Sequence, residues 1–297
     1  RKLKNVNVAI KQFTPEVFKS PSIQKLGVVY AETRRDPSKP LELLDGNLSV
    51  QEYAGAIPLV LTEKNRQRTG SELPLEAWTA LIDEEVRKLD TDLKRQLGLT
   101  AIAYPAPVHK SDLLNLNTDL SKATISVPFA ARPEADIGLV EQPGVASAFA
   151  PADWQITSIV DTSTGRLVQV HSGYVGLDNK ILEKAVATTG INPRQSVAYV
   201  SPHAQAGYVV NQVNNGLVDR FSQSEQLRDH LLYKPDGVVE LDMKGALKAQ
   251  LEEAGFRDDH VEFSPNNTLS DATLYSQSNF LTKGVNGRFG VILGKRQ

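Results

Sequence analysis

The sequence contains no cysteine, one methionine and two tryptophans among its 297 residues. The lack of cysteine excludes disulfide bonds, a thiolate nucleophile and thiolate metal ligands. It leaves the redox compartment open, but a reducing cytosol suits such a chain, and we expect a cytoplasmic protein. Because Trp78 and Trp154 are the only tryptophans, the place of each in the fold is informative.

An excess of charge of either sign is also missing. Lys and Arg number 33 against 35 Asp and Glu, which gives a net charge of −2 and no general attraction to phosphate backbones or anionic lipid surfaces. No apolar run approaches the roughly 18 residues that a membrane-spanning helix needs. We therefore expect neither nucleic acid nor a membrane as a partner. The 40% of hydrophobic residues are enough to fill a sizeable core.

Strand-like and helix-like segments alternate along the chain, without an internal repeat. Apolar residues at helical spacing between Ser71 and Gly98 predict an amphipathic helix with Trp78 on its buried face. Residues 144–173 predict two buried strands joined by a turn at Gly165. Shorter segments predict strands at 6–10, 26–30 and 287–295, and helices at 179–190, near 224–233 and at 242–255.

Three of the five histidines follow a predicted strand, where side chains are exposed at the rim of a sheet. These are His109 in "PAPVHKSD", His171 in "HSGYVG" and His203 in "VSPHAQAG". Each histidine taken singly is more often a surface or hydrogen-bonded residue than a ligand or a base. Three strand ends that converge would nevertheless bring the imidazoles to one place. His230 and His260 lie in polar contexts and carry no such expectation.

The order of short motifs resembles the laccase-domain family, also described as multicopper polyphenol oxidoreductase-like proteins and purine nucleoside phosphorylases with adenosine deaminase activity. That family shows "QVHG", "ADC", "HAGWRG", "GPAIG", "CT", "FFSYRRD" and "TGR" in this order. The corresponding stretches here are "APVHKSD", "APADW", "HSGYVG", "VSPHAQ", "NNT", "LYSQSN" and "NGRFGVIL". The turn with Asp136 and the Pro143-Gly144 pair also match. The resemblance covers nearly the whole chain from about residue 26.

The resemblance implies an α+β fold in which mixed β-sheets pack together with flanking helices, as a single laccase-domain-like unit. We expect residues 26–297 to form this domain and residues 1–25 to be an N-terminal extension. Residues 1–4 contain neither a methionine nor an apolar signal core. We therefore expect a processed end, or a start within a longer protein.

One of the residues that form the family's metal site is replaced in this sequence. The resemblance places a zinc-binding and catalytic His-Cys-His trio at His109, Trp154 and His171, so an indole stands at the cysteine position. A catalytic zinc needs three protein ligands and a water, and the indole has no free lone pair to offer. We accordingly expect no metal and no other cofactor.

Arginines of the family's motifs are replaced as well. The arginine of "HAGWRG" is Val175, and the paired arginines of "SYRRD" are Ser278 and Asn279. These changes remove positive charge that would hold a phosphate or a carboxylate. Arg288 of the "GR" pair is kept.

Two hypotheses follow. In the first, the chain is a catalytically impaired relative that serves as a binding or structural subunit, with Trp154 filling the former pocket. In the second, it is an active purine nucleoside phosphorylase or adenosine deaminase in which His109 and His171 exchange protons. Candidate ligand-binding residues are Asp153, Trp154, His203 and Arg288. A purine nucleoside, a protein partner or a second copy of the chain are the partners to consider.

Overall fold

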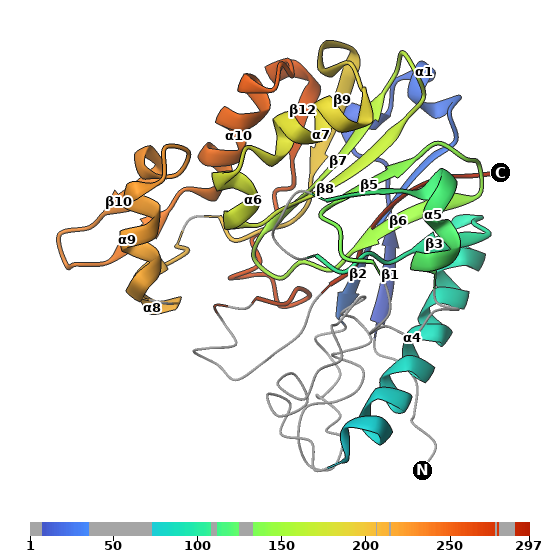
Figure 1. Ribbon diagram of the computed structural model, residues 1–297, viewed down its shortest axis with the longest axis horizontal. Coiled ribbons are helices and arrows are strands. Elements are labelled where there is room, and N and C mark those ends of the chain that lie inside the picture. The colour runs from blue at the N-terminus through green and yellow to red at the C-terminus, as the bar shows by residue number, and fades with distance from the viewer. Residues whose placement is uncertain are drawn as a thin grey trace.

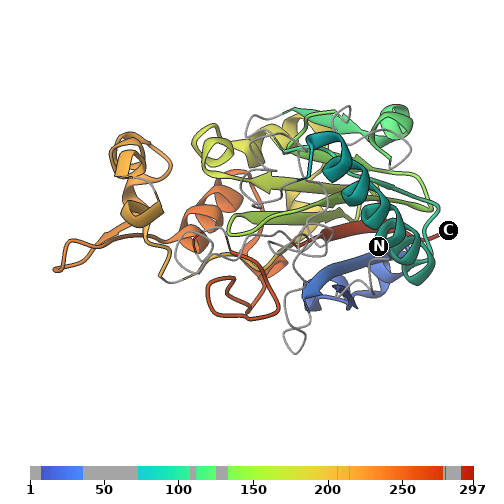
Figure 2. The same ribbon diagram turned by 90° about the horizontal axis from the view of Figure 1, so that it is seen from below.

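The computed structural model describes residues 8–35, 73–107, 112–124, 133–205, 207–213, 215–276, 278 and 289–297. Two mixed β-sheets pack face to face, and helices cover the outer face of the larger sheet (Figures 1 and 2). This is the predicted α+β architecture of mixed sheets with flanking helices. No helix in the described ranges is both long enough and apolar enough to cross a membrane.

The smaller sheet has five strands in the order β1-β2-β13-β6-β3. All its neighbours run antiparallel except β6 and β3. The first strand belongs to the segment 1–25, and it pairs along its whole length with the second. The strands are β1 (Val8–Gln12), β2 (Val28–Arg35), β13 (Val291–Lys295), β6 (Val145–Phe149) and β3 (Ala101–Ala103).

The larger sheet has six strands in the order β12-β9-β7-β8-β5-β4. Its two outer pairs are parallel and its three inner pairs are antiparallel. The strands are β12 (Val261–Phe263), β9 (Ser196–Val200), β7 (Gln155–Asp161), β8 (Leu167–Ser172), β5 (Ile137–Val140) and β4 (Leu113–Asn115).

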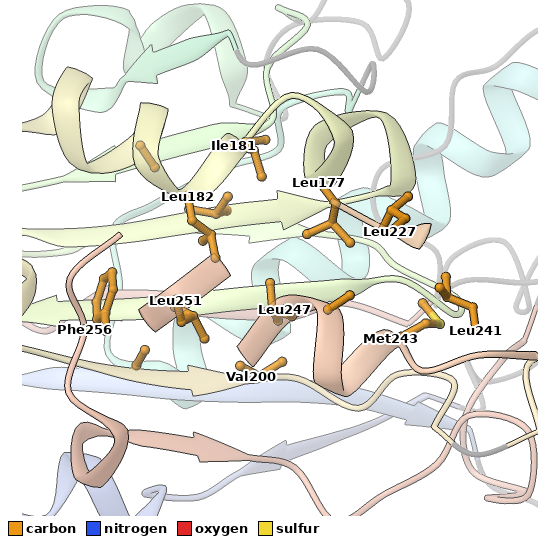
Figure 3. Packing of buried hydrophobic residues seen from close by; sticks show 14 of the residues in the cluster. Leu177, Ile181, Leu182, Val200, Leu227, Leu241, Met243, Leu247, Leu251 and Phe256 are labelled. Atoms are coloured by element: carbon orange, nitrogen blue, oxygen red, sulfur yellow. The ribbon is translucent and has the colours of Figure 1, made fainter. Parts of the chain in front are cut away.

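Alternation along these buried strands divides the core in two. Ile159 and Val168 point to the helices, whereas Val160 and Leu167 point to the other sheet. The helical face is covered by α6 (Tyr174–Asp178), α7 (Ile181–Thr189) and α10 (Met243–Glu253), whose apolar side chains interlock as Figure 3 shows. Every residue of β7 and β8 is buried, because the helices cover one face of these strands and the smaller sheet covers the other.

The remaining helices are short apart from α4 (Leu75–Leu97). This long helix confirms the prediction made from the spacing, and it ends at Gly98, whose φ of 68° is the left-handed conformation that glycine adopts readily. The others are α1 (Pro21–Gln24), α5 (Leu116–Ala123), α8 (Val210–Val213) and α9 (Asn215–Gln223), with 3-10 turns at Glu16–Phe18, Pro193–Gln195, Arg228–His230 and Asp258–His260.

The helix predicted near 224–233 is wrong. A 3-10 turn at Arg228–His230 leads into strand β10 (Leu231–Tyr233), which pairs antiparallel with β11 (Val239–Leu241). The intervening Pro235-Asp236-Gly237 favours a turn over a helix, since Gly237 adopts a φ of 82°. This turn reverses the chain and produces a hairpin.

Candidate functional site

The hairpin of β7 and β8 places three predicted site residues at one end of the larger sheet. Ile156 lies opposite His171, and Gln155 lies opposite Ser172, so Asp153 and Trp154 precede β7 where β8 ends. Gly165 provides the turn at the other end with a φ of 71°. The sequence "ADWQITSIVDTSTGRLVQVHSG" therefore folds back on itself and joins the Asp-Trp pair to the histidine turn, as predicted.

His171 is a buried imidazole held by an acidic partner. Its Nδ1 lies 3.0 Å from Oδ1 of Asp136, which is fully buried, and its backbone N–H donates to the Asp136 carbonyl at 2.8 Å. The ring stacks on Phe149 with centroids 6.4 Å apart. The carboxylate accepts the Nδ1 proton and so favours the tautomer whose lone pair is on Nε2. This arrangement orients the ring as a general base requires.

Trp154 belongs to a group of aromatic side chains on the helix-covered face. Its ring centroid lies 5.7 Å from that of Tyr174 and 5.7 Å from that of Tyr208. Tyr174 in turn packs on Phe221 at 5.7 Å, and the guanidinium of Arg220 lies 5.0 Å from its centroid. We call Trp154, Tyr174, Tyr208 and Phe221 the aromatic cluster. Burial raises the pKa of the Tyr208 hydroxyl well above 10, so this ring stays neutral.

Asp153 is buried beside Trp154, and its carboxylate ties two distant segments together. Oδ1 accepts a hydrogen bond from the Thr268 hydroxyl at 2.9 Å. Oδ2 accepts from the backbone N–H of Ser278 at 2.8 Å and from its hydroxyl at 3.0 Å. The described structure thus gives this residue a positioning role, and the predicted ligand-binding role stays a prediction.

His203 lies on the opposite face of the larger sheet from His171. Its ring packs edge-on against Phe263 with centroids 6.1 Å apart, and its Nδ1 donates to the Ser201 carbonyl at 2.9 Å. The side chain is fully buried, and none of the described residues forms a hydrogen bond with its Nε2. Burial lowers the pKa of the imidazole to about 4. The two strand-end histidines therefore do not converge on one point.

Two of the predicted site residues, His109 and Arg288, lie outside the described residues. The altered position Asn279 also lies outside, whereas Val175 and Ser278 are half-buried. Asp136 was matched only as part of a turn, and its role as the partner of His171 becomes visible once β5 is placed beside β8. Tyr208 carried no signal, because it follows a short loop 54 residues after Trp154.

The donor set that the resemblance assigns to zinc does not fit the metal. Trp154 offers an N–H and no lone pair, and its indole is held against Tyr174 and Tyr208. In the part of the chain that the structure describes, no three His, Cys, Asp or Glu side chains are grouped as metal ligands.

Comparisons with known proteins agree with this architecture. A family model described as "Multi-copper polyphenol oxidoreductase laccase" matches residues 78–295. Among curated proteins, none matches the chain.

Solved structures that share the fold include the following three. The hypothetical protein YfiH of Bacillus licheniformis is 16% identical, with a TM-score of 0.67 over 94% of this chain and 98% of its own. YlmD from Geobacillus stearothermophilus is 20% identical, with a TM-score of 0.67 over 94% of each chain. Protein NMB0706 of Neisseria meningitidis is 18% identical, with a TM-score of 0.66 over 98% of this chain and 100% of its own. At these identities the likeness concerns the fold alone.

Proposed function

The chain belongs to the family described as multi-copper polyphenol oxidoreductase laccase, and on that premise we propose that it is a catalytically impaired member which acts as a binding or structural subunit. The proposal rests on the position and the packing of Trp154. This residue stands at the family's cysteine position, and its indole packs against Tyr174 and Tyr208. An indole in that position removes a metal ligand and fills space that a metal and its water would need.

A second feature supports a binding role over a catalytic one. Val175 stands where the family has an arginine, and Ser278 uses its backbone N–H and hydroxyl to hold Asp153. Positive charge for a phosphate is therefore missing at two of the altered positions. The half-buried rings of Trp154 and Tyr174 keep partly exposed surface on which a planar ligand such as a purine can stack.

Replacing Trp154 by cysteine is the direct test of this proposal. We expect the purified wild-type protein to contain little zinc, and the Trp154→Cys variant to acquire close to one zinc per chain, because a thiolate then joins the two imidazoles that the resemblance assigns, His109 and His171. Elemental analysis of protein purified without added zinc or chelator measures this directly. Phosphorolysis and deamination of inosine, adenosine and methylthioadenosine are then assayed on both proteins.

The other tryptophan supplies a matched control. Trp78→Cys introduces the same thiol in α4, and we expect its zinc content to equal that of the wild type. Adding His171→Ala to Trp154→Cys should return the zinc content to the wild-type level. Stoichiometric zinc in the wild-type protein, or nucleoside turnover by it, would refute catalytic impairment. A shift in melting temperature on adding a nucleoside, without turnover, would identify the bound ligand.

The pairing of His171 with Asp136 favours a second candidate function, an active nucleoside-cleaving or deaminating enzyme without the metal. An imidazole oriented by a buried carboxylate accepts a proton at Nε2, and His109 would be the second acid or base. Under this candidate, His171→Ala abolishes turnover and Asp136→Asn lowers kcat with little change in KM. Under the first candidate, neither variant has any turnover to lose.

A further inference from the structure

A row of polar side chains crosses the core between the two β-sheets. On the larger sheet, Gln169 of β8 lies opposite Ser158 of β7 on one side and opposite Gly138 of β5 on the other. Leu167 and Val160 face the smaller sheet, so Gln169 and Ser158, two residues away along their strands, face it as well. Both side chains are fully buried. Buried polar groups of this kind need hydrogen-bond partners inside the core.

The smaller sheet adds a third polar side chain to this row. Ser147 of β6 is fully buried, and its Oγ lies only 2.5 Å from the place that a Cβ would take at Gly138. The hydroxyl therefore fills the space of the missing side chain, beside Gln169. Gln169 itself spans the two sheets, because its Nε2 donates to the Val291 carbonyl on β13 at 3.0 Å. Directly opposite side chains of paired strands have Cβ atoms roughly 4.5–5.5 Å apart, so the three polar groups lie together.

Each of these three side chains carries an oxygen atom to which no described residue forms a hydrogen bond. The atoms are Oε1 of Gln169, Oγ of Ser158 and Oγ of Ser147, and all three are buried from solvent. Exchanging the amide oxygen and nitrogen of Gln169 gives no remedy, since Oε1 would then face the Val291 carbonyl. A buried polar atom without a partner is destabilising. Three such atoms side by side indicate that they share a partner.

We propose that Gln169, Ser158 and Ser147 bind one internal water molecule between the two sheets. The water donates a hydrogen bond to Oε1 of Gln169, which can only accept, and it accepts hydrogen bonds from the two serine hydroxyls. About three hydrogen bonds to otherwise unpaired groups are usual for a buried water. The bound water connects β7 and β8 of the larger sheet to β6 of the smaller one.

The chemistry of the three oxygen atoms favours water over other ligands. All three are neutral, whereas a divalent cation held by oxygen takes about six or more ligands, carboxylates among them. No metal-binding group of His, Cys, Asp or Glu side chains occurs in the described ranges. The three side chains are fully buried between the sheets, which gives a larger organic ligand no approach from solvent.

A high-resolution crystal structure tests the position of the water. We expect an ordered water at about 2.6–3.2 Å from Oε1 of Gln169 and from both serine Oγ atoms. Two outcomes would overturn the proposal. One is a direct hydrogen bond between Ser147 and Gln169 that closes the row without a water. The other is a row that contains no density between its three oxygen atoms.

Urea unfolding of alanine variants tests the hydrogen bonds in solution through the sign of the effect. If each hydroxyl binds the water, Ser147→Ala and Ser158→Ala each remove a hydrogen bond and raise the equilibrium constant of unfolding about fivefold. If the hydroxyls have no partner, removing them leaves this constant unchanged or lowers it. Ser201→Ala is the matched control, because this buried hydroxyl has two protein partners, the Ile156 N–H at 3.0 Å and the Pro202 carbonyl at 3.1 Å.

The double variant shows whether one water serves both serines. With a shared water, Ser147→Ala weakens the site that Ser158 uses, so the combined rise in the unfolding constant should be smaller than the product of the two single rises. Circular dichroism spectra in the absence of urea establish that each variant is folded. Independent effects of the two substitutions contradict a shared water. Single variants that are as stable as the wild type, or more stable, while Ser201→Ala is destabilised, refute the site altogether.

Discussion

Lowering the pH from 7 to 5 is expected to reduce the free energy of unfolding by about 2 kcal/mol through His203 alone, and by about 3 kcal/mol at pH 4. The pKa of this imidazole is about 4 in the folded protein, against 6.5 in the ordinary case. Burial is the main cause, and the charge of Lys244 adds to it. The hydrogen bond to the Ser201 carbonyl and the charge of Asp242 oppose the shift.

The sign follows from proton binding. Between pH 6.5 and pH 4 the unfolded chain binds a proton at His203 that the folded protein does not, so stability falls as the pH falls through this window. Asp161 and Asp271 affect the stability at a lower pH than His203 does. Burial raises the pKa of both carboxyls, but hydrogen bonds from neighbouring groups outweigh it and bring each pKa below 3.8. Their contribution to stability is therefore lost only below about pH 4.

Urea unfolding at several pH values measures the effect. His203→Asn keeps an N–H that can donate to the Ser201 carbonyl and cannot take up a proton, so its stability should stay nearly constant between pH 7 and pH 5. His260 is the matched control, since its Nδ1 lies 3.2 Å from the Ser196 carbonyl in a half-buried position. The pH dependence of His260→Asn is measured beside that of His203→Asn and the wild type. Parallel curves for wild type and His203→Asn would contradict a depressed pKa.

Local signals in the sequence predicted the elements whose pattern is repeated or strongly marked. The helix that ends at Gly98 has many apolar residues at one spacing, and the hairpin around Gly165 has two long buried strands with a clear turn. The segment 224–233 is different. Its few residues fit a short helix or a strand equally well. The turn at Gly237 and the pairing with β11 make the end of this segment a strand.

The candidate site was predictable only where its residues lie close together in the sequence. Trp154 and His171 lie on one hairpin, so their neighbourhood follows from a local turn. Asp136 meets His171 through the pairing of β5 with β8, and Thr268 meets Asp153 across 115 residues of sequence. Such contacts depend on strand order, which one sequence does not reveal. The two faces of the larger sheet likewise separate His203 from His171, although His171 lies at the end of β8 and His203 shortly follows β9.

Asp153→Ala is expected to lower the free energy of unfolding by about 3–4 kcal/mol. The carboxylate is buried and accepts three hydrogen bonds, from the Thr268 hydroxyl and from the N–H and hydroxyl of Ser278. Its removal takes the acceptor from the buried Thr268 hydroxyl and releases the segment around Ser278 from the start of β7. Asp153→Asn keeps the shape but turns one acceptor into a donor, so we expect roughly half of that loss.

A double-mutant cycle with Thr268→Val separates this positioning role from a ligand-binding one. Valine matches threonine in shape and has no hydroxyl to leave unpaired, so the two substitutions should be non-additive in urea unfolding, with a coupling of about 1–2 kcal/mol. Additive losses, or an Asp153→Ala protein as stable as wild type, would contradict the positioning role and favour direct contact with a ligand. Because Trp154 is the next residue along the chain, freeing Asp153 should also shift its fluorescence, and Thr268→Val alone should reproduce part of that shift.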